Sequence, residues 1–272
     1  MTALTFTLRQ ATKQRIDCSP LTPDKLQGKT IEEIAELPLV VGNKTSSVTS
    51  LFSITPGDHQ HIKIVNSQSE LDYIGEGMGA GKITIEGNVG AYLGLLMTAG
   101  EIEVNGSSDY FTGCEMAGGV IHIHGNAGNQ VASVRPGRKN GMTGGTIIIA
   151  GNAGDRVGDH MRRGNVLIAG SAGDYCAARM ISGTIMVLGE VGHHLGYAMK
   201  RGTVLLMKSP QYGITANFND CGQHSLAFLP LLLSSFKQWN SPFSTLVSFS
   251  SVQRYAGDMA GIGLGEILVK QG

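Results

Sequence analysis

The chain has 272 residues, a formal net charge of zero at pH 7, 39 glycines and only 6% aromatic residues. This length suits one large domain, or one domain with extensions. The neutral charge argues against nucleic acid or an anionic membrane surface as a partner of the molecule as a whole.

Residues 1–60 have an ordinary composition and are expected to form a small α/β cap or adaptor. Residues 4–8 alternate like a strand with one apolar face. Thr22 followed by Pro23 predicts the start of a short helix. Residues 30–33 form a capping-box pattern that predicts a second helix ending before Pro38. Such a cap would cover the first turn of the repeat that follows.

A block of 19 residues recurs within residues 61–207. Each block reads M-x-x-G-x-(I/V)-x-(I/V/L)-x-G-x-x-G-x-x-x-(G/A), and an insertion of seven residues at about 133–139 shifts the register once. The blocks begin at Met78, Met97, Met116, Met142, Met161, Met180 and Met199. A fixed period this short is typical of a solenoid, in which each turn packs only on its neighbours.

The positions within each block predict how a turn folds. Counted from the methionine as zero, positions five and seven are apolar in every block, which predicts a short strand with one inward face. Glycines at positions three, nine, twelve and sixteen predict corners, where a positive φ or a close backbone approach excludes a Cβ. We therefore predict an all-β fold: a right-handed parallel β-helix over 61–207, the N-terminal cap, and a mixed C-terminal extension over 208–272.

Position six should face outward, and its character changes along the chain. It is polar in the first turns and apolar in the last four, at Ile148, Leu167, Met186 and Leu205. Such an apolar stripe is not expected to remain in contact with water. The simpler explanation is that the C-terminal zone covers it. The other is that it docks a partner protein, and each could hold for a different part of the stripe.

No catalytic motif appears in the sequence. The candidates for chemistry are scattered: His122, Cys114, Asp159 and His160. His122 and His124 share one face of a strand, but no carboxylate or cysteine near them in the sequence completes a ligand set, and His193 and His194 are expected to face solvent. We therefore predict no catalytic residue, no metal site and no cofactor bound by this chain alone.

The compartment is expected to be the cytoplasm. The first ten residues lack the apolar core of a signal peptide, and the apolar run at 226–233 is too short to span a bilayer. The four cysteines are scattered and do not suggest a disulfide framework.

Basic residues gather in one predicted column. They flank the methionines and occupy the insertion: Arg162, Arg163, Arg179, Lys200, Arg201, Arg135, Arg138 and Lys139. Stacked turns would place the flanking set along one corner, rising roughly 10 Å over two turns. Three interpretations stay open: a solvated face with local salt bridges, a site for an anionic ligand tail, or a site for the acidic surface of a partner.

The repeat resembles the GXGXG domain. The turns in GGTIIIAGNAGDRVGDHMRRGNVLIAGSAGDYCAARMISGTIMVLGEVG look like those of glutamate synthase large chains and of the C subunit of formylmethanofuran dehydrogenase. The C-terminal zone, with FLPLLL and RYAGDMAGIGLGEILV, most resembles the C subunit of the bacterial formyltransferase/hydrolase complex of methylotrophs.

The resemblance implies a docking subunit without an active site of its own. In that family this type of chain packs against an amidohydrolase-like A subunit that carries a metal centre. A D subunit transfers a formyl group between tetrahydromethanopterin and a furan-type carrier such as methanofuran or methylofuran, and a B subunit is also expected. The bacterial complex releases formate during formaldehyde oxidation. The acidic tail of the carrier is a candidate ligand for the basic column. Alternatives are the C subunit of a formylmethanofuran dehydrogenase, a glutamate-synthase-type spacer and a free-standing enzyme.

Overall fold

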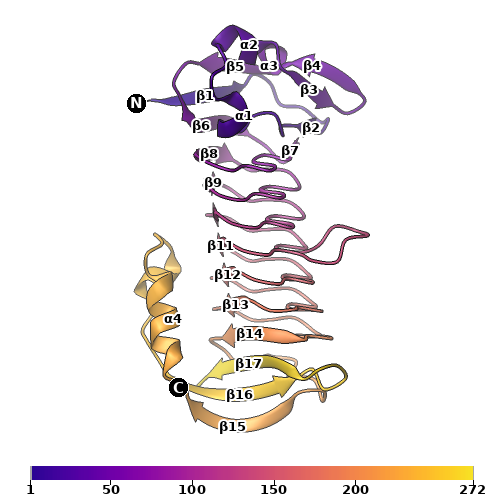
Figure 1. Ribbon diagram of the computed structural model, residues 1–272, viewed down its shortest axis with the longest axis vertical. Coiled ribbons are helices and arrows are strands. Elements are labelled where there is room, and N and C mark those ends of the chain that lie inside the picture. Colours follow the sequence, from indigo (N-terminus) through magenta and orange to yellow (C-terminus); the bar gives the residue numbers. More distant parts are fainter. Residues whose placement is uncertain (1, 272) are drawn as a thin grey trace.

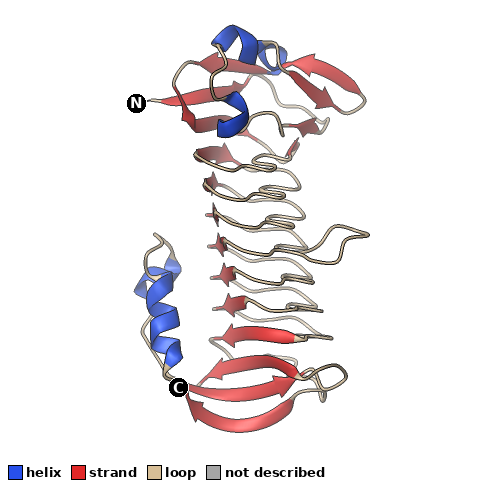
Figure 2. Ribbon diagram, viewed as in Figure 1, coloured by secondary structure: helices blue, strands red, loops and turns tan. Residues whose placement is uncertain are grey.

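The computed structural model describes residues 2–271, and one 13-stranded sheet runs the length of the molecule (Figure 1). Its strands, in spatial order, are β15 (Asn219–Ser225), β16 (Ser251–Gly257), β17 (Leu264–Lys270), β14 (Arg201–Leu206), β13 (Thr184–Val187), β12 (Asn165–Ile168), β11 (Thr146–Ile149), β10 (Val120–Ile123), β9 (Glu101–Asn105), β8 (Lys82–Gly87), β6 (Asp58–Ser67), β1 (Ala3–Leu8) and β5 (Phe52–Thr55). Pairing is parallel from β1 to β17 and antiparallel at the two ends. Helices are few and short, so the predicted all-β class is confirmed (Figure 2).

The strands pair at the spacing that the repeat predicts. Position five forms one column of paired residues: Ile83, Ile102, Ile121, Ile147, Val166, Ile185 and Val204. The insertion lies between β10 and β11 and leaves this column intact. A second set of parallel bridges joins the turns elsewhere, from Val89 through Ser108, Ala127, Ala153 and Ala172 to Val191. Each turn is therefore hydrogen-bonded to the next at two places, which gives the stack of turns in Figure 2.

Methionines fill the core and glycines allow the turns to approach. All seven methionines of the repeat are fully buried. Gly100 has φ +90°, and a Cβ on it would lie 2.7 Å from both the carbonyl oxygen of Gly81 and Cε of Met78. Gly128 has no positive φ, but a Cβ there would lie 2.9 Å from the backbone carbon of Asp109. Both predicted reasons for glycine therefore occur, at different corners.

The N-terminal elements form where the sequence predicts them. On β1 the predicted apolar face is buried. Helix α1 (Pro23–Leu26) follows Thr22, and α2 (Ile31–Ala35) has both halves of the capping box, between Thr30 and Glu33. The remaining elements are α3 (Val48–Leu51) and a second sheet in the order β4 (Lys44–Ser47), β3 (Pro38–Val41), β2 (Ile16–Asp17), β7 (Leu71–Asp72). Side chains of β1 belong to the same buried cluster as the methionines.

Beyond β14 the sequence period ends but the parallel sheet continues. The chain leaves the stack and returns with its last strand, so that Val204 on β14 pairs with Ile267 on β17. Strand β17 is therefore the next parallel strand of the sheet after β14. Strands β16 and β15 then add two antiparallel strands, and β15 forms the edge of the sheet.

The C-terminal zone covers the apolar stripe. Helix α4 (Phe228–Phe236) and the 3₁₀-helix η1 (Pro242–Thr245) lie beside the stack (Figure 1). Fully buried stripe residues and residues of this zone form one cluster: Ile148, Leu167, Met186 and Leu205 with Leu229, Leu233, Phe236 and Phe243. The simpler explanation of the stripe is the one observed. The other hypothesis, that a partner docks on these four side chains, is wrong, because the chain itself buries them.

None of the helices within residues 2–271 has the length and apolar character needed to cross a membrane.

Replacing Leu233 with alanine should lower the free energy of unfolding by about 2–5 kcal/mol, because it opens a cavity between α4 and the stripe. Leu231 in the same helix is 75% exposed, so Leu231→Ala should change this free energy by less than about 0.5 kcal/mol. Urea titration followed by the fluorescence of Trp239, the one tryptophan of the chain and a neighbour of this cluster, measures both. Equal effects of the two substitutions would contradict the described packing.

Candidate functional site

The stacking of turns places basic side chains in a column along one corner. The residues follow buried methionines, and their backbone groups join successive turns. The N–H of Arg162 donates to the carbonyl oxygen of Met142 at 2.8 Å, and that of Lys200 donates to Met180 at 2.8 Å. The backbone is thus held in place while the side chains of Arg162, Arg163, Lys200 and Arg201 are exposed.

Three hollows follow this column, and the second shares lining residues with each of the other two. We call the three together the basic groove. The first has a volume of about 310 Å³ and is lined by Arg162, Arg163, Ile181, Ser182, Lys200, Arg201 and Ile262. The second, about 190 Å³, is lined by Thr143, Arg162 and Arg163. The third, about 480 Å³, is lined by Leu96, Glu115, Gly137, Arg138, Lys139, Asn140, Gly141 and Thr143.

The basic groove carries an excess of positive charge. Its cationic side chains are Arg138, Lys139, Arg162, Arg163, Lys200 and Arg201, and none of them forms an ion pair with another residue in the range 2–271. Glu115 is the acidic residue among those that line the groove, and Arg135 already neutralises it. Exposed guanidinium and ammonium groups arranged in this way attract carboxylate or phosphate groups.

Two of the predicted basic residues are engaged within the chain. Arg135 donates to Glu115 twice, from Nε to Oε1 at 2.9 Å and from Nη2 to Oε2 at 2.8 Å. Arg179 makes the same kind of two-bond pair with Asp159, with Nε to Oδ1 at 2.9 Å. The interpretation as local salt bridges describes these two residues, so they are not kept as ligand-binding candidates.

Hydrogen bonding favours the charged forms of Glu115, Arg135 and Arg179, as the directions of their pKa shifts indicate. The bonds from Arg135 lower the pKa of Glu115 below its usual range. The bonds to Glu115 and Asp159 raise the pKa of Arg135 and of Arg179, respectively. Arg179 and Asp159 link neighbouring turns, because they are 20 residues apart in a repeat of 19. Arg135 lies in the insertion and ties that segment to Glu115. Their role is to hold the corner beside the groove.

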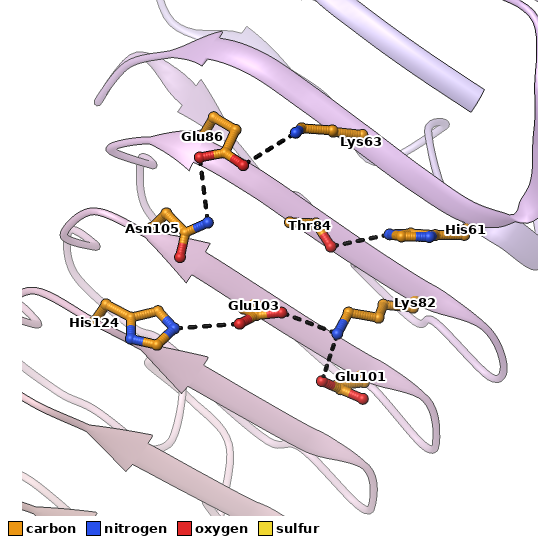
Figure 3. Close-up of polar contacts among 9 residues, drawn as sticks. All are labelled: His61, Lys63, Lys82, Thr84, Glu86, Glu101, Glu103, Asn105 and His124. Carbon is orange, nitrogen blue, oxygen red and sulfur yellow. Dashed lines mark hydrogen bonds and ion pairs between the residues drawn. The ribbon is translucent and has the colours of Figure 1, made fainter. Parts of the chain in front are cut away.

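The outer face of the first turns carries a separate polar network (Figure 3). Lys82 lies 2.9 Å from carboxylate oxygens of both Glu101 and Glu103. Lys63 lies 3.1 Å from Glu86 on the neighbouring strand. Opposite charges here pair with one another, so this face lacks the charge excess of the basic groove.

His122 on β10 and His124 directly after it share one face, as predicted, with ring centroids 4.2 Å apart. The stack places one carboxylate beside them: Glu103 is in register with His122 and lies 3.3 Å from Nε2 of His124. Within residues 2–271, no three His, Cys, Asp or Glu side chains are arranged to hold a metal ion. Burial, and then the neighbouring His124, lower the pKa of His122.

The other chemical candidates lie in separate surroundings. Burial raises the pKa of Cys114 to about 12, so its thiol is a poor nucleophile at neutral pH. Asp159 is buried, and Nδ1 of His160 lies 3.0 Å from it. His193 and His194 are exposed, as expected, and His193 stacks on Tyr212 with ring centroids 3.6 Å apart.

Residues 35–221 match the sequence model of the GXGXG motif family, which is more than half of the chain. A solved structure is similar from end to end. It is a chain of the formyltransferase/hydrolase complex of Methylorubrum extorquens in complex with methylofuran, with 36% identity and a TM-score of 0.91 over 98% of this chain and 100% of that chain.

Curated relatives match over shorter segments. The C subunit of the tungsten-containing formylmethanofuran dehydrogenase 2 of Methanococcus maripaludis is 32% identical over 94 residues, which is 34% of this chain and 35% of that protein. The C subunit of the molybdenum-containing formylmethanofuran dehydrogenase 1 of Methanothermobacter thermautotrophicus is 42% identical over 77 residues, 28% of this chain and 19% of that protein. The chain thus spans about a third or less of the length of these relatives.

The Glu115–Arg135 pair predicts a defined pH dependence. Because the pKa of Glu115 is lowered in the folded state, its stabilisation is complete above the unfolded-state pKa of about 4.3 and disappears as the pH falls through the folded-state pKa. Glu115→Gln should therefore cost about 1 kcal/mol at pH 7 and almost nothing near pH 2.

Urea titrations across this pH range measure the difference. Glu36→Gln is the matched control, since Glu36 is exposed and forms no ion pair within residues 2–271. A cost for Glu115→Gln that is constant with pH would contradict the assignment.

Proposed function

Since this chain belongs to the GXGXG family, we propose that it is the structural and docking subunit, equivalent to the C subunit, of a formyltransferase/hydrolase complex. The observation that carries the proposal is its similarity to one whole chain of such a complex. That similarity extends beyond residues 35–221, the range of the family model, and so takes in most of the N-terminal cap and the C-terminal zone with α4 and β17. No active site is assigned to this chain.

In the proposed complex the chemistry belongs to the partner subunits. An amidohydrolase-like A subunit would hold the metal ion. A D subunit would transfer the formyl group between tetrahydromethanopterin and a methylofuran-like carrier, and a B subunit would complete the assembly. The net conversion is formyl-tetrahydromethanopterin to formate. The methylofuran in the related complex supports this kind of carrier. This chain is proposed to bind no cofactor alone.

The basic groove would be the surface through which this subunit meets an anionic group. It extends from Leu96 to Lys200, which is five turns, or roughly 24 Å at the usual spacing between strands. Its six cations lack partners within residues 2–271, so an anion would not have to displace one. Two occupants remain candidates: the acidic tail of the carrier and the acidic surface of a partner subunit.

A second candidate is the C subunit of a formylmethanofuran dehydrogenase. The identities of 32% and 42% with such subunits favour it, although over only 94 and 77 residues. A glutamate-synthase-type spacer is supported by the shared repeat alone.

The proposed architecture is a right-handed parallel β-helix over 61–207, with the cap at 1–60 and the extension at 208–272. Two parallel ladders per turn support a coiled stack, and the general preference for right-handed parallel crossovers supports its hand. The proposed location is the cytoplasm. Four free thiols in the described residues support it, because thiols persist in a reducing compartment.

A tagged copy of the chain, purified from its own host, should bring down an amidohydrolase-like chain and a formyltransferase chain. Native mass spectrometry with identification of the co-purifying proteins provides the measurement. A molybdenum- or tungsten-containing dehydrogenase chain in their place would favour the second candidate. Recovery of a monomer or a homo-oligomer alone would contradict both.

Replacing Arg163 and Arg201 with glutamate should slow turnover of a long-tailed carrier by roughly tenfold and leave assembly intact, because two attractive contacts become repulsive. The matched control replaces Lys13 and Lys44, which are exposed cap residues without ion pairs within residues 2–271, and changes the charge equally. Unchanged kinetics would reject binding of the tail. Loss of assembly would point to the acidic surface of a partner.

A further inference from the structure

The first hollow of the basic groove takes its side chains from three successive turns. The two residues that follow each repeat methionine line it: Arg162 and Arg163, Ile181 and Ser182, and Lys200 and Arg201. Backbone bonds keep these positions aligned, since the N–H of Ile181 donates to Met161 at 2.7 Å and that of Lys200 donates to Met180 at 2.8 Å. Successive turns lie roughly 4.8 Å apart, so the two pairs of cations are roughly 10 Å apart, with Ile181 on the turn between them.

A second isoleucine reaches the same hollow from the C-terminal zone. Ile262 lies in the loop between β16 and β17 and is 55% exposed. The start of this loop is fixed by the buried carboxylate of Asp258. Its Oδ2 accepts from the N–H of Ala198 at 2.9 Å, and its Oδ1 accepts from the N–H of Ala260 at 2.8 Å. Ile262 is therefore carried by an anchored loop at the side of the hollow.

No carboxylate competes for the cations of this hollow. None of its lining residues is acidic. Asp258 is engaged by backbone N–H groups. Glu266, the next acidic residue along the chain, lies 3.2 Å from Nε of Arg254 and accepts from the hydroxyl of Thr203 at 2.7 Å. An anion that enters the hollow would therefore meet cations that have no acidic partner there.

Charge and apolar surface together restrict the ligand. A small inorganic anion such as sulfate can pair with cations, but it leaves Ile181 and Ile262 uncovered. An aliphatic acid with one carboxylate covers the isoleucines, but it supplies an anion to one pair of cations only. Phosphate groups carry up to about two charges each and lose more hydration beside isoleucine. An aliphatic segment with a carboxylate at each end satisfies both kinds of side chain.

We propose that this hollow binds a flexible aliphatic chain that carries carboxylates roughly 10 Å apart. The chain would lie against Ile181 and Ile262, with one carboxylate at each pair of cations, and the hydroxyl of Ser182 can donate to the ligand. This inference names the ligand chemistry of the basic groove and rests on the function proposed for that groove. Two sources share this chemistry: the acidic tail of the carrier and a glutamate-bearing segment of a partner subunit.

Titration of the purified full-length chain with octanedioate, followed by NMR, tests the ligand class. Octanoate, of equal length with one carboxylate, and butanedioate, with a shorter spacer, are the matched ligands. Octanedioate should bind at least roughly fivefold more tightly than either, because it alone joins two carboxylates through a segment long enough to reach both pairs of cations. Equal affinities for the three ligands would overturn the inference and leave the proposed subunit role standing.

Variants of Ile262 test the apolar contact. Ile262→Ser should remove most of the preference for octanedioate, and Ile262→Leu should keep it, because leucine preserves the apolar surface. Val40→Ser is the matched control, since Val40 is an exposed β-branched residue of the N-terminal cap. Circular dichroism establishes that each variant is folded. An unchanged preference in Ile262→Ser would contradict the proposed contact.

Assays of the assembled complex distinguish the two sources. Slower turnover of a long-tailed carrier by Ile262→Ser, with assembly intact, would identify the tail as the ligand. Weaker binding of Ile262→Ser to the remaining subunits would identify the partner segment. No effect on either would overturn the inference. Binding of octanedioate by a parent chain that assembles with no partner would overturn the proposed function and leave the carboxylate chemistry of the hollow standing.

Discussion

Backbone hydrogen bonds between equivalent positions of successive turns hold this molecule together, and its other features depend on that alignment. Two sets of parallel pairs show this alignment: the column from Ile83 to Val204 and the bridges from Val89 to Val191. Side chains add to it: Oδ1 of Asn126 accepts from the N–H of Asn152 one turn on, at 2.8 Å. At corners such as Gly100, glycine leaves out a Cβ that would otherwise collide with Met78 and Gly81 of the preceding turn.

Stacking of this kind produces surfaces rather than enclosed pockets. Residues one period apart become neighbours, so a local bias in one position of the repeat becomes a stripe on the outside. Position six gives a charged, solvated face around Glu103 and an apolar face around Leu167, which α4 covers. The positions beside the methionines give the basic groove. A chain with open surfaces of different chemistry suits a docking role better than it suits catalysis.

The 19-residue period made much of the fold predictable. The arrangement of the strands beyond β14, where the period ends, could not be predicted. Strands, buried methionines and the outward stripe follow from local alternation. Three features do not. Strand β17 pairs in parallel with β14 although the two are far apart in sequence. Tyr92 and Arg156 adopt positive φ, a conformation that favours glycine, at position fourteen, where the repeat has no glycine. Glu103 reaches His124 only through stacking. The pair Arg179–Asp159 did leave a signal, since a separation of 20 in a repeat of 19 makes diagonal neighbours. The pair Arg135–Glu115 did not, because Arg135 lies in the insertion, outside the period.

In the proposed complex this chain supports the activity, and its partner subunits perform the chemistry. The direct measurement is formyl transfer by the purified complex before and after removal of this chain, and again after the folded chain is added back. Formyl-transfer activity should fall when the chain is removed, return when it is added back, and be zero for the chain alone. Full activity without the chain, or turnover by the isolated chain, would contradict it.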